Sequence, residues 1–211
     1  MKILILCTGN SCRSQMAHGF LQSFDDNLIV RSAGTQASGK LNLKAVEAMR
    51  KIGIDISHHT SDQVEQYLGE EWDYVITVCG GAKETCPMFS GKVKQQLHIG
   101  FDDPSDAIGT QEFIDSEFIR VRDEIRKAFY DFYQEEILLK DIDNRSDNTF
   151  VCHCGNITLG EVKNLVSKGH TNIKSIREAL DKRDEGMCKT TSPSGICCHS
   201  RFNLIIQQLK K

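Results

Sequence analysis

The sequence has little of what membrane-spanning, secreted or nucleic-acid-binding proteins need. No stretch of its 211 residues approaches the roughly 18 consecutive apolar residues of a membrane-spanning helix. Lys and Arg number 26 against 29 Asp and Glu, so no basic excess favours nucleic acid. Lys2 leads directly into a strand pattern instead of a signal peptide. We therefore expect a soluble, cytoplasmic protein that binds neither membranes nor nucleic acid.

Internal repeats and low-complexity segments are also missing, whereas cysteine is plentiful. The chain has nine cysteines, which fall into one group from Cys7 to Cys86 and another from Cys152 to Cys198. In a reducing compartment, cysteines at this frequency indicate catalysis or metal binding more than structural disulfides. The two groups predict two separate sites, and the length allows one ordinary domain and a small one.

Apolar runs alternate with amphipathic helical patterns through the first 140 residues. Strands are expected at residues 3–6, 28–30, 74–78 and 96–99, and helices at 13–24, 42–52, 64–68 and about 112–139. This order predicts an α/β domain, with a parallel four-stranded sheet flanked by helices, over residues 1–140. Residues 141–149 are polar and aperiodic, as expected of a linker. Three short helical patterns, at 158–166, 173–180 and 201–209, predict a small α-helical domain over residues 150–211.

The first strand ends in a loop with the residue types of an anion site. Five residues separate Cys7 from Arg13, where a helix begins, so their backbone N–H groups can surround an anion. The partial positive charge of these N–H groups, together with the Arg13 guanidinium, is expected to lower the pKa of Cys7 and make it a nucleophile. The predicted oxyanion-binding residues are Thr8, Gly9, Asn10, Ser11, Cys12, Arg13 and Ser14.

The motif Cys7-x5-Arg13-Ser14 resembles the phosphate-binding loop of low-molecular-weight protein tyrosine phosphatases and of the thioredoxin-coupled arsenate reductases that share their fold. The resemblance covers about residues 1–140 and includes Phe101-Asp102-Asp103-Pro104. Cys79 and Cys86 favour the reductases. A phosphatase needs no thiol besides its nucleophile, whereas arsenate reduction needs two electrons, which a relay of thiols can deliver.

The resemblance implies that Cys7 attacks arsenate bound by Arg13, with Asp103 as general acid and Asp102 as its competitor for that role. Cys79 then attacks the Cys7 sulfur and arsenite leaves. Cys86 next attacks Cys79, which leaves a Cys79–Cys86 disulfide for thioredoxin or another dithiol to reduce. Ser14 is expected to hydrogen-bond the Cys7 thiolate, Asn10 to hold the loop's shape and Cys12 to serve in packing. The alternatives are a low-molecular-weight phosphatase and a non-enzymatic, metal-responsive protein that only binds oxyanions.

One position departs from the reductase pattern. In some of these enzymes, residues that match Asn10, Ser32 and Asp62 bind potassium together with a glutamate of the first helix. His18 stands where that glutamate is expected, which argues against a cation site.

The second cysteine group resembles iron–sulfur domains. Cys152-His153-Cys154-Gly155 before an amphipathic helix resembles the start of a bacterioferritin-associated-ferredoxin-like [2Fe-2S] domain, and the closing Cys188…Cys197-Cys198 resembles the iron–sulfur domain of some copper chaperones. The resemblance implies ligation by four cysteines, with Cys197 as the spare thiol and zinc as the alternative metal. The expected ligands are Cys152, Cys154, Cys188 and Cys198.

Two roles for this centre stay open at this point. A [2Fe-2S] centre passes one electron at a time, whereas reduction of a Cys79–Cys86 disulfide needs two. Direct reduction of that disulfide would therefore require a radical intermediate or the delivery of a second electron. The other expected role is sensing, or docking to a partner. In either role a metal would stabilise a domain whose three short helices form only a small core.

Overall fold

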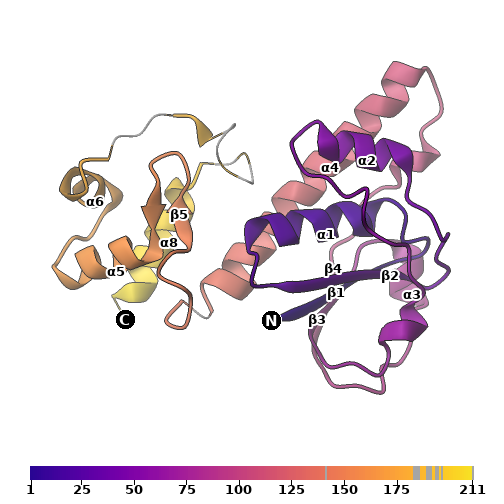
Figure 1. The fold of residues 1–211 in the computed structure, drawn as a ribbon, viewed down its shortest axis with the longest axis horizontal. Coiled ribbons are helices and arrows are strands. Elements are labelled where there is room, and N and C mark those ends of the chain that lie inside the picture. The colour runs from indigo at the N-terminus through magenta and orange to yellow at the C-terminus, as the bar shows by residue number, and fades with distance from the viewer. Residues whose placement is uncertain (141, 183–185, 189–191, 193–194, 196, 211) are drawn as a thin grey trace. The chain divides into compact units, whose positions relative to one another are not determined.

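The computed structural model describes residues 1–140, 142–182, 186–188, 192, 195 and 197–210. Within it the chain divides into two compact units, Met1–Tyr130 and Asp131–Lys211 (Figure 1). Among the described residues, no helix combines the length and the apolar character that crossing a bilayer requires.

The first unit is built on a parallel sheet. Its four strands are β1 (Lys2–Cys7), β2 (Ile29–Gly34), β3 (Trp72–Thr77) and β4 (Val93–His98), in the order β2-β1-β3-β4. Every neighbouring pair is parallel, which confirms the predicted α/β fold. The side chains of residues 3–6 in β1 have no exposed surface, as expected for a central parallel strand that is covered on both faces.

Helices and short 3-10 turns connect the strands in the first unit. They are α1 (Arg13–Phe24), α2 (Leu43–Arg50), η1 (Val64–Tyr67), η2 (Pro104–Asp106) and α4 (Gln111–Phe132). Helix α1 spans the predicted residues and packs against β1, β2 and α2. Helix α4 continues as a π-helix, η3 (Tyr133–Leu138), so the predicted long helix is present but changes its winding near its end.

Three elements of this unit differ from the sequence prediction, the first being β2, which was expected at residues 28–30 and runs on to Gly34. Strand β4 begins at Val93, three residues earlier than expected, because Lys94, Gln95 and Gln96 form an exposed strand edge that has no apolar signal. Helix α3 (Gly80–Glu84) is a short helix that the sequence pattern did not predict. The Cys79 thiol caps it by accepting the Ala82 N–H, and cysteine is not among the residues that usually indicate a helix start.

The second unit contains the three predicted helices and a hairpin. The helices are α5 (Leu159–Ser167), α6 (Ile173–Ala179) and α8 (His199–Leu209). The antiparallel strands β5 (Phe150–Cys152) and β6 (Ile157–Thr158) were not predicted, so the expectation of a purely helical unit was incomplete. These strands are too short for a period-of-two pattern, and Asn156 adopts a φ of 49° in the turn between them.

The predicted linker is hydrogen-bonded to this second unit. Residue 141 lies outside the described residues, and further along the segment the carbonyl groups of Asp147 and Thr149 accept the N–H groups of Gly160 and Leu159 at 2.9 and 2.8 Å. These bonds attach the segment to the first turn of α5.

Gly34 ends β2 at a point where the backbone approaches the loop after β1. A Cβ atom on Gly34 would lie 2.5 Å from the Thr8 carbonyl oxygen and 3.0 Å from Ala37 Cα. Both neighbours are backbone, so we expect Gly34→Ala to lower the free energy of unfolding by about 1–3 kcal/mol through overpacking. Urea denaturation measures this change. Gly69→Ala is the matched control, because a Cβ there meets nothing within 4 Å. Equal stability of the two variants would contradict this account of Gly34.

Candidate active site

Parallel pairing of β1 with β3 brings the first two predicted relay cysteines together. Leu6 of β1 lies opposite Thr77 of β3, so Cys7 and Cys79 follow at the same edge of the sheet. Both side chains are buried, with relative exposures of 4% and 3%. The predicted neighbourhood of these two thiols is present in the fold.

The loop between β1 and α1 is held by side-chain hydrogen bonds around Asn10. Asn10 has a φ of 45° and is fully buried. Its Nδ2 donates to Ser14 Oγ at 3.0 Å, and its Oδ1 accepts the Asp62 N–H at 2.9 Å. Gln15 Nε2 donates to the Asn10 carbonyl at 3.0 Å. Ser14 Oγ accepts from Asn10, which leaves its hydroxyl hydrogen for the expected bond to Cys7, and Gln15 is a supporting residue that the sequence prediction missed.

The backbone of this loop turns its carbonyl groups toward the segment after β2. Thr35, Gln36 and Ser38 donate their N–H groups to the carbonyls of residues 7, 8 and 9 at 3.1, 2.9 and 2.9 Å. In the described part of the chain, the N–H groups of residues 9–12 take part in no hydrogen bond as donors. The loop's carbonyl groups are therefore hydrogen-bonded, while its N–H groups stay available as donors. This arrangement suits a loop that binds anions.

The two buried thiols share a proton in favour of Cys79. The Thr8 N–H and the Ala82 N–H donate to Cys79 Sγ at 3.3 and 3.4 Å, and the Thr8 hydroxyl lies 3.4 Å from the same sulfur. The hydrogen bond that Cys7 donates is the largest cause that lowers the pKa of Cys79, to about 5. The same hydrogen bond, followed by burial, raises the pKa of Cys7 above its ordinary value.

This distribution corrects the expectation that the loop lowers the pKa of Cys7. Arg13 does favour a thiolate at Cys7, but the donated hydrogen bond and burial outweigh it. Thr8, predicted as an oxyanion ligand, directs its N–H to Cys79 instead. The sequence places a thiol at the loop but gives no sign that a second thiol accepts its proton.

Arg13 and Asp103 form the polar side of the site. Arg13 Nη2 pairs with Asp103 Oδ2, and Nη1 donates to the Phe101 carbonyl at 3.0 Å. Arg13 Nε is buried and has no partner among the described groups. Asp102 instead lies 3.4 Å from Arg120, with 79% of its side chain exposed. Of the two aspartates, the structure therefore brings Asp103 to the loop.

Cys86 lies outside this cluster. Its side chain is half-buried, and its thiol donates to the Pro87 carbonyl at 3.9 Å, while burial raises the pKa of the thiol. It lines a pocket of about 200 Å³ together with Lys83 and His98. All nine cysteines are free thiols in this structure.

Three of the four predicted ligand cysteines of the second unit are joined by sulfur contacts. Cys152 Sγ lies 3.6 Å from Cys154 Sγ, which lies 3.5 Å from Cys188 Sγ. Cys198 donates a hydrogen bond to Cys152, which is the largest cause lowering the pKa of Cys152 to about 5. Cys197 is exposed. Residues 189–191, 193–194 and 196 of the closing motif lie outside the described residues.

Pairwise contact of thiols is not yet a metal site. Among the described residues, no group of three or more His, Cys, Asp or Glu side chains is arranged to hold a metal ion. Sulfur atoms around one tetrahedral metal at 2.3 Å would be about 3.8 Å apart. The two measured separations, 3.6 and 3.5 Å, are close to that spacing. The sulfur atoms of Cys152, Cys154 and Cys188 therefore lie near the spacing that a shared metal would require.

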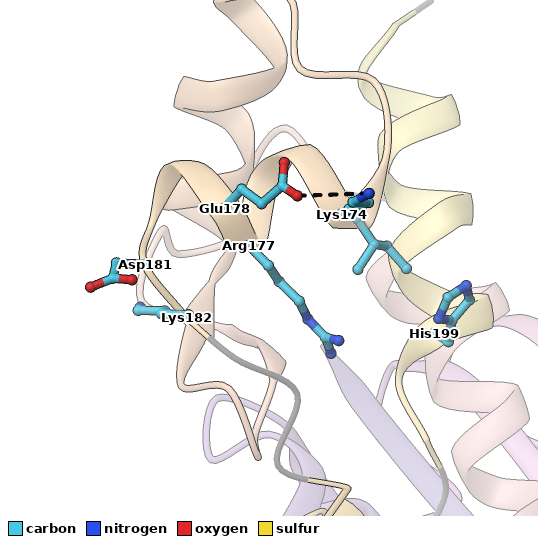
Figure 2. A pocket seen from close by; sticks show the side chains of 7 residues that line it. Lys174, Arg177, Glu178, Asp181, Lys182 and His199 are labelled. Carbon is cyan, nitrogen blue, oxygen red and sulfur yellow. Dashed lines mark ion pairs between the residues drawn. The ribbon is translucent and has the colours of Figure 1, made fainter.

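A pocket of about 460 Å³ adjoins this cysteine cluster. Figure 2 shows Lys174, Arg177 and Lys182 around it with His199, and the Lys174–Glu178 pair at its edge. Arg177 also donates to Cys152 Sγ at 3.6 Å, so its guanidinium reaches from the pocket to the cluster. A positive charge at this point favours thiolate over thiol at Cys152.

Comparison with known proteins gives a family and relatives for the first part of the chain. Residues 2–142 match the family model described as low molecular weight phosphotyrosine protein phosphatase. An arsenate reductase from Halalkalibacterium halodurans is 50% identical over 131 residues, which cover 62% of this chain and 93% of that protein. One from Bacillus subtilis is 49% identical over 131 residues, with the same coverage.

A solved structure has the same fold. The chain described as an arsenate reductase in the phosphate binding state matches with a TM-score of 0.53 and 29% sequence identity. The match covers 62% of this chain and 95% of that one.

The shared proton can be measured as thiolate absorbance in the ultraviolet. The spectrum of a Cys7→Ser/Cys79→Ser double variant is subtracted from that of the wild type. We expect the difference to show the absorbance of one thiolate, which appears as pH rises through a midpoint near 5, the pKa of Cys79. Below that pH both sulfurs are protonated. Thr8→Val removes one donor and should move the midpoint up by about one pH unit.

Cys12→Ser is the control for this titration. Burial raises the pKa of Cys12 to about 12, so its difference spectrum should stay flat from about pH 4 to about pH 8. A wild-type pair that gains no thiolate below about pH 8 contradicts the assignment.

Proposed function

The chain belongs to the low molecular weight phosphotyrosine protein phosphatase family, and on that premise we propose that its first unit reduces arsenate to arsenite. The observation that carries the proposal is the placement of two buried thiols, Cys7 and Cys79, at the same edge of the sheet, because a phosphatase needs only the first of them. Arsenate reductases about 50% identical over this unit support it.

Arsenate binds in the loop. The N–H groups of residues 9–12 and the buried Arg13 Nε provide donors that no described group uses. Arg13 exchanges Asp103 for the oxyanion, since both are anions that bind a guanidinium bidentately. The Asp103 carboxyl group is then released beside the arsenic–oxygen bond that must break.

The first step joins sulfur to arsenic. The Cys7 thiolate attacks arsenic, and one arsenate hydroxyl leaves as water with a proton from Asp103. The proton that Cys7 gives up passes through the arsenate oxygens to the Asp103 carboxylate, which returns it to the departing hydroxyl, so Cys79 stays a thiolate. The product is a Cys7–arsenic(V) adduct, and no electrons have yet moved to arsenic.

The second step carries the reduction. The Cys79 thiolate attacks the Cys7 sulfur, the sulfur–arsenic bond breaks, and its electron pair leaves with arsenic as arsenite. Donors from Thr8 and Ala82 keep Cys79 in the nucleophilic form for this attack. The thiolate of Cys86 then attacks Cys79 and frees Cys7. Because Cys86 is bonded elsewhere in this structure, residues 80–86 must rearrange for it to reach Cys79.

Thioredoxin or another dithiol reduces the resulting Cys79–Cys86 disulfide in this proposal. Thiol–disulfide exchange requires that the attacked sulfur be reachable by the partner. Cys86 is the more exposed of the two thiols, since Cys79 is buried and Cys86 is half-buried. The dithiol therefore attacks at Cys86.

Serine variants at the relay positions test the reductase. We expect Cys79→Ser to abolish arsenite formation, because no sulfur can then attack the Cys7 adduct. Cys86→Ser should allow one turnover and stop at a Cys7–Cys79 disulfide. Arsenite release with thioredoxin and its reductase is the measurement, and the exposed Cys197→Ser is the control with unchanged activity.

Phosphatase activity is the competing outcome of the same variants. A low-molecular-weight phosphatase would hydrolyse an aryl phosphate equally well with and without Cys79, and would show no multiple-turnover arsenate reduction. Ser105, Asp106 and Ala107 follow Pro104, so no aromatic side chain stands just after it to line a phosphotyrosine cleft.

For the second unit we propose a [2Fe-2S] centre held by Cys152, Cys154, Cys188 and Cys198. Sulfur contacts link Cys152, Cys154 and Cys188, and three of the four residues are buried, Cys198 among them. When bound, such a centre supplies one-electron redox chemistry. The chain's own contribution is to keep the sulfurs close, with the Gly155 N–H and Arg177 donating to Cys152 at 3.3 and 3.6 Å.

Anaerobic purification followed by an optical spectrum tests the centre. We expect visible charge-transfer bands that bleach with dithionite, together with equal amounts of iron and inorganic sulfide. Cys198→Ser should lose them, because its sulfur contacts Cys152, while the adjacent Cys197→Ser should keep them. A colourless protein with stoichiometric zinc would assign the same four sulfurs to zinc instead.

A further inference from the structure

A second polar pocket, which the proposed reaction does not use, lies in the first unit. It has a volume of about 420 Å³. Helix α1 contributes His18 and Gln22, β2 contributes Arg31 and Ser32, and the segment before η1 contributes His58 and His59. Its remaining lining residues are Thr60, Asp62 and Tyr67.

Three imidazoles gather in this pocket. The rings of His18 and His59 stack with centroids 4.2 Å apart, and the His58 ring meets that of His59 edge-on at 4.7 Å. Arg31 adds a permanent positive charge, and no ion pair involves it among the described residues. The pocket therefore concentrates groups that carry or can acquire positive charge.

Few negatively charged groups face this pocket. Asp62 is the carboxylate in the lining, and its Oδ2 already accepts the hydroxyl groups of Tyr67 at 2.6 Å and Thr60 at 3.1 Å. Outside the lining, Asp55 favours the charged form of His59. Burial is the largest cause that lowers the pKa of His18 to about 3 and of His59 to about 4, and the neighbouring cationic groups lower the pKa of both histidines further.

Hydrogen bonding determines which nitrogen of His59 can gain a proton. Gln15 Nε2 donates to the carbonyls of Asn10 and Thr60 at 3.0 and 2.8 Å, which fixes the orientation of its amide. Gln15 Oε1 is then an acceptor 3.0 Å from His59 Nδ1, so Nδ1 carries the hydrogen. In the neutral ring Nε2 is therefore the unprotonated atom, and protonation there creates a new donor.

We propose that this pocket binds a small dianionic oxyanion of the sulfate or phosphate class, with uptake of a proton by its histidines. Arg31 supplies the fixed charge, and the protonated His59 supplies a charge that appears only when the anion is present to compensate for burial. The same Gln15 amide contacts both His59 and the Asn10 carbonyl, so an occupant shares a hydrogen-bond chain with the loop that binds arsenate.

Imidazole NMR spectra of the full chain separate this pocket from the loop, because each histidine is observed individually. Sulfate is the probe, since its charge is constant over the pH range of interest. We expect sulfate to raise the pKa of His59 from about 4 toward its ordinary value and to bind more tightly as pH falls from about 7 to about 5. His98, which lines the separate pocket beside Cys86, should not respond.

Charge-removing variants locate the site. Arg31→Gln should weaken sulfate binding, read at the His59 ring, about tenfold through loss of a charge-assisted hydrogen bond. Lys51→Gln removes the same charge from an exposed residue outside the pocket and should leave the affinity unchanged. The proposal is overturned if sulfate moves only the amides of residues 8–14, or if both variants weaken binding equally. Neither result bears on arsenate reduction, which the relay variants test.

Discussion

The placement of two buried thiols, Cys7 and Cys79, side by side at one edge of the sheet is the constraint on which the first unit's chemistry depends. It exists because two adjacent parallel strands end at the same edge of the sheet, so one sulfur follows each strand. Burial of both sulfurs makes two thiolates costly, and one shared proton avoids that cost. Hydrogen-bond donors stabilise a thiolate. The N–H groups of Thr8 and Ala82 donate to the Cys79 sulfur, which lowers the pKa of Cys79.

The rest of the site follows from how charge is balanced around this pair. The charge of Arg13 lowers the pKa of Cys7, but the guanidinium is also paired with Asp103 and bonded to the Phe101 carbonyl. An arriving oxyanion competes for that guanidinium and for the unengaged N–H groups of residues 9–12. Substrate binding and nucleophile activation are therefore linked, because the same loop that binds the anion also holds the Cys7–Cys79 pair.

Sequence patterns were sufficient to predict the strands and helices whose apolar residues recur at regular spacing. Four parallel strands and the helices α1 and α4 follow from apolar runs and amphipathic faces, and the spacing of Cys7 and Arg13 predicts the loop. Helix α3 escaped prediction because a cysteine caps it and two glycines begin it. The pKa of Cys7 was predicted in the wrong direction, since the outcome depends on a partner 72 positions away whose donors come from Thr8 and Ala82.

The two cysteine groups also differ in how their sulfurs meet, and that difference separates a relay from a ligand set. A relay needs its thiols to meet in turn, and in the first unit Cys86 is held apart while Cys7 and Cys79 are in contact. A metal centre needs its thiols together at once, and in the second unit sulfur contacts already join Cys152, Cys154 and Cys188. If Cys86 lay permanently beside Cys79, it would compete with Cys7 for the same sulfur before arsenate had bound. In the proposed relay, the bond of Cys86 to the Pro87 carbonyl therefore protects the order of the reaction, whereas the proposed cluster requires all four sulfurs together.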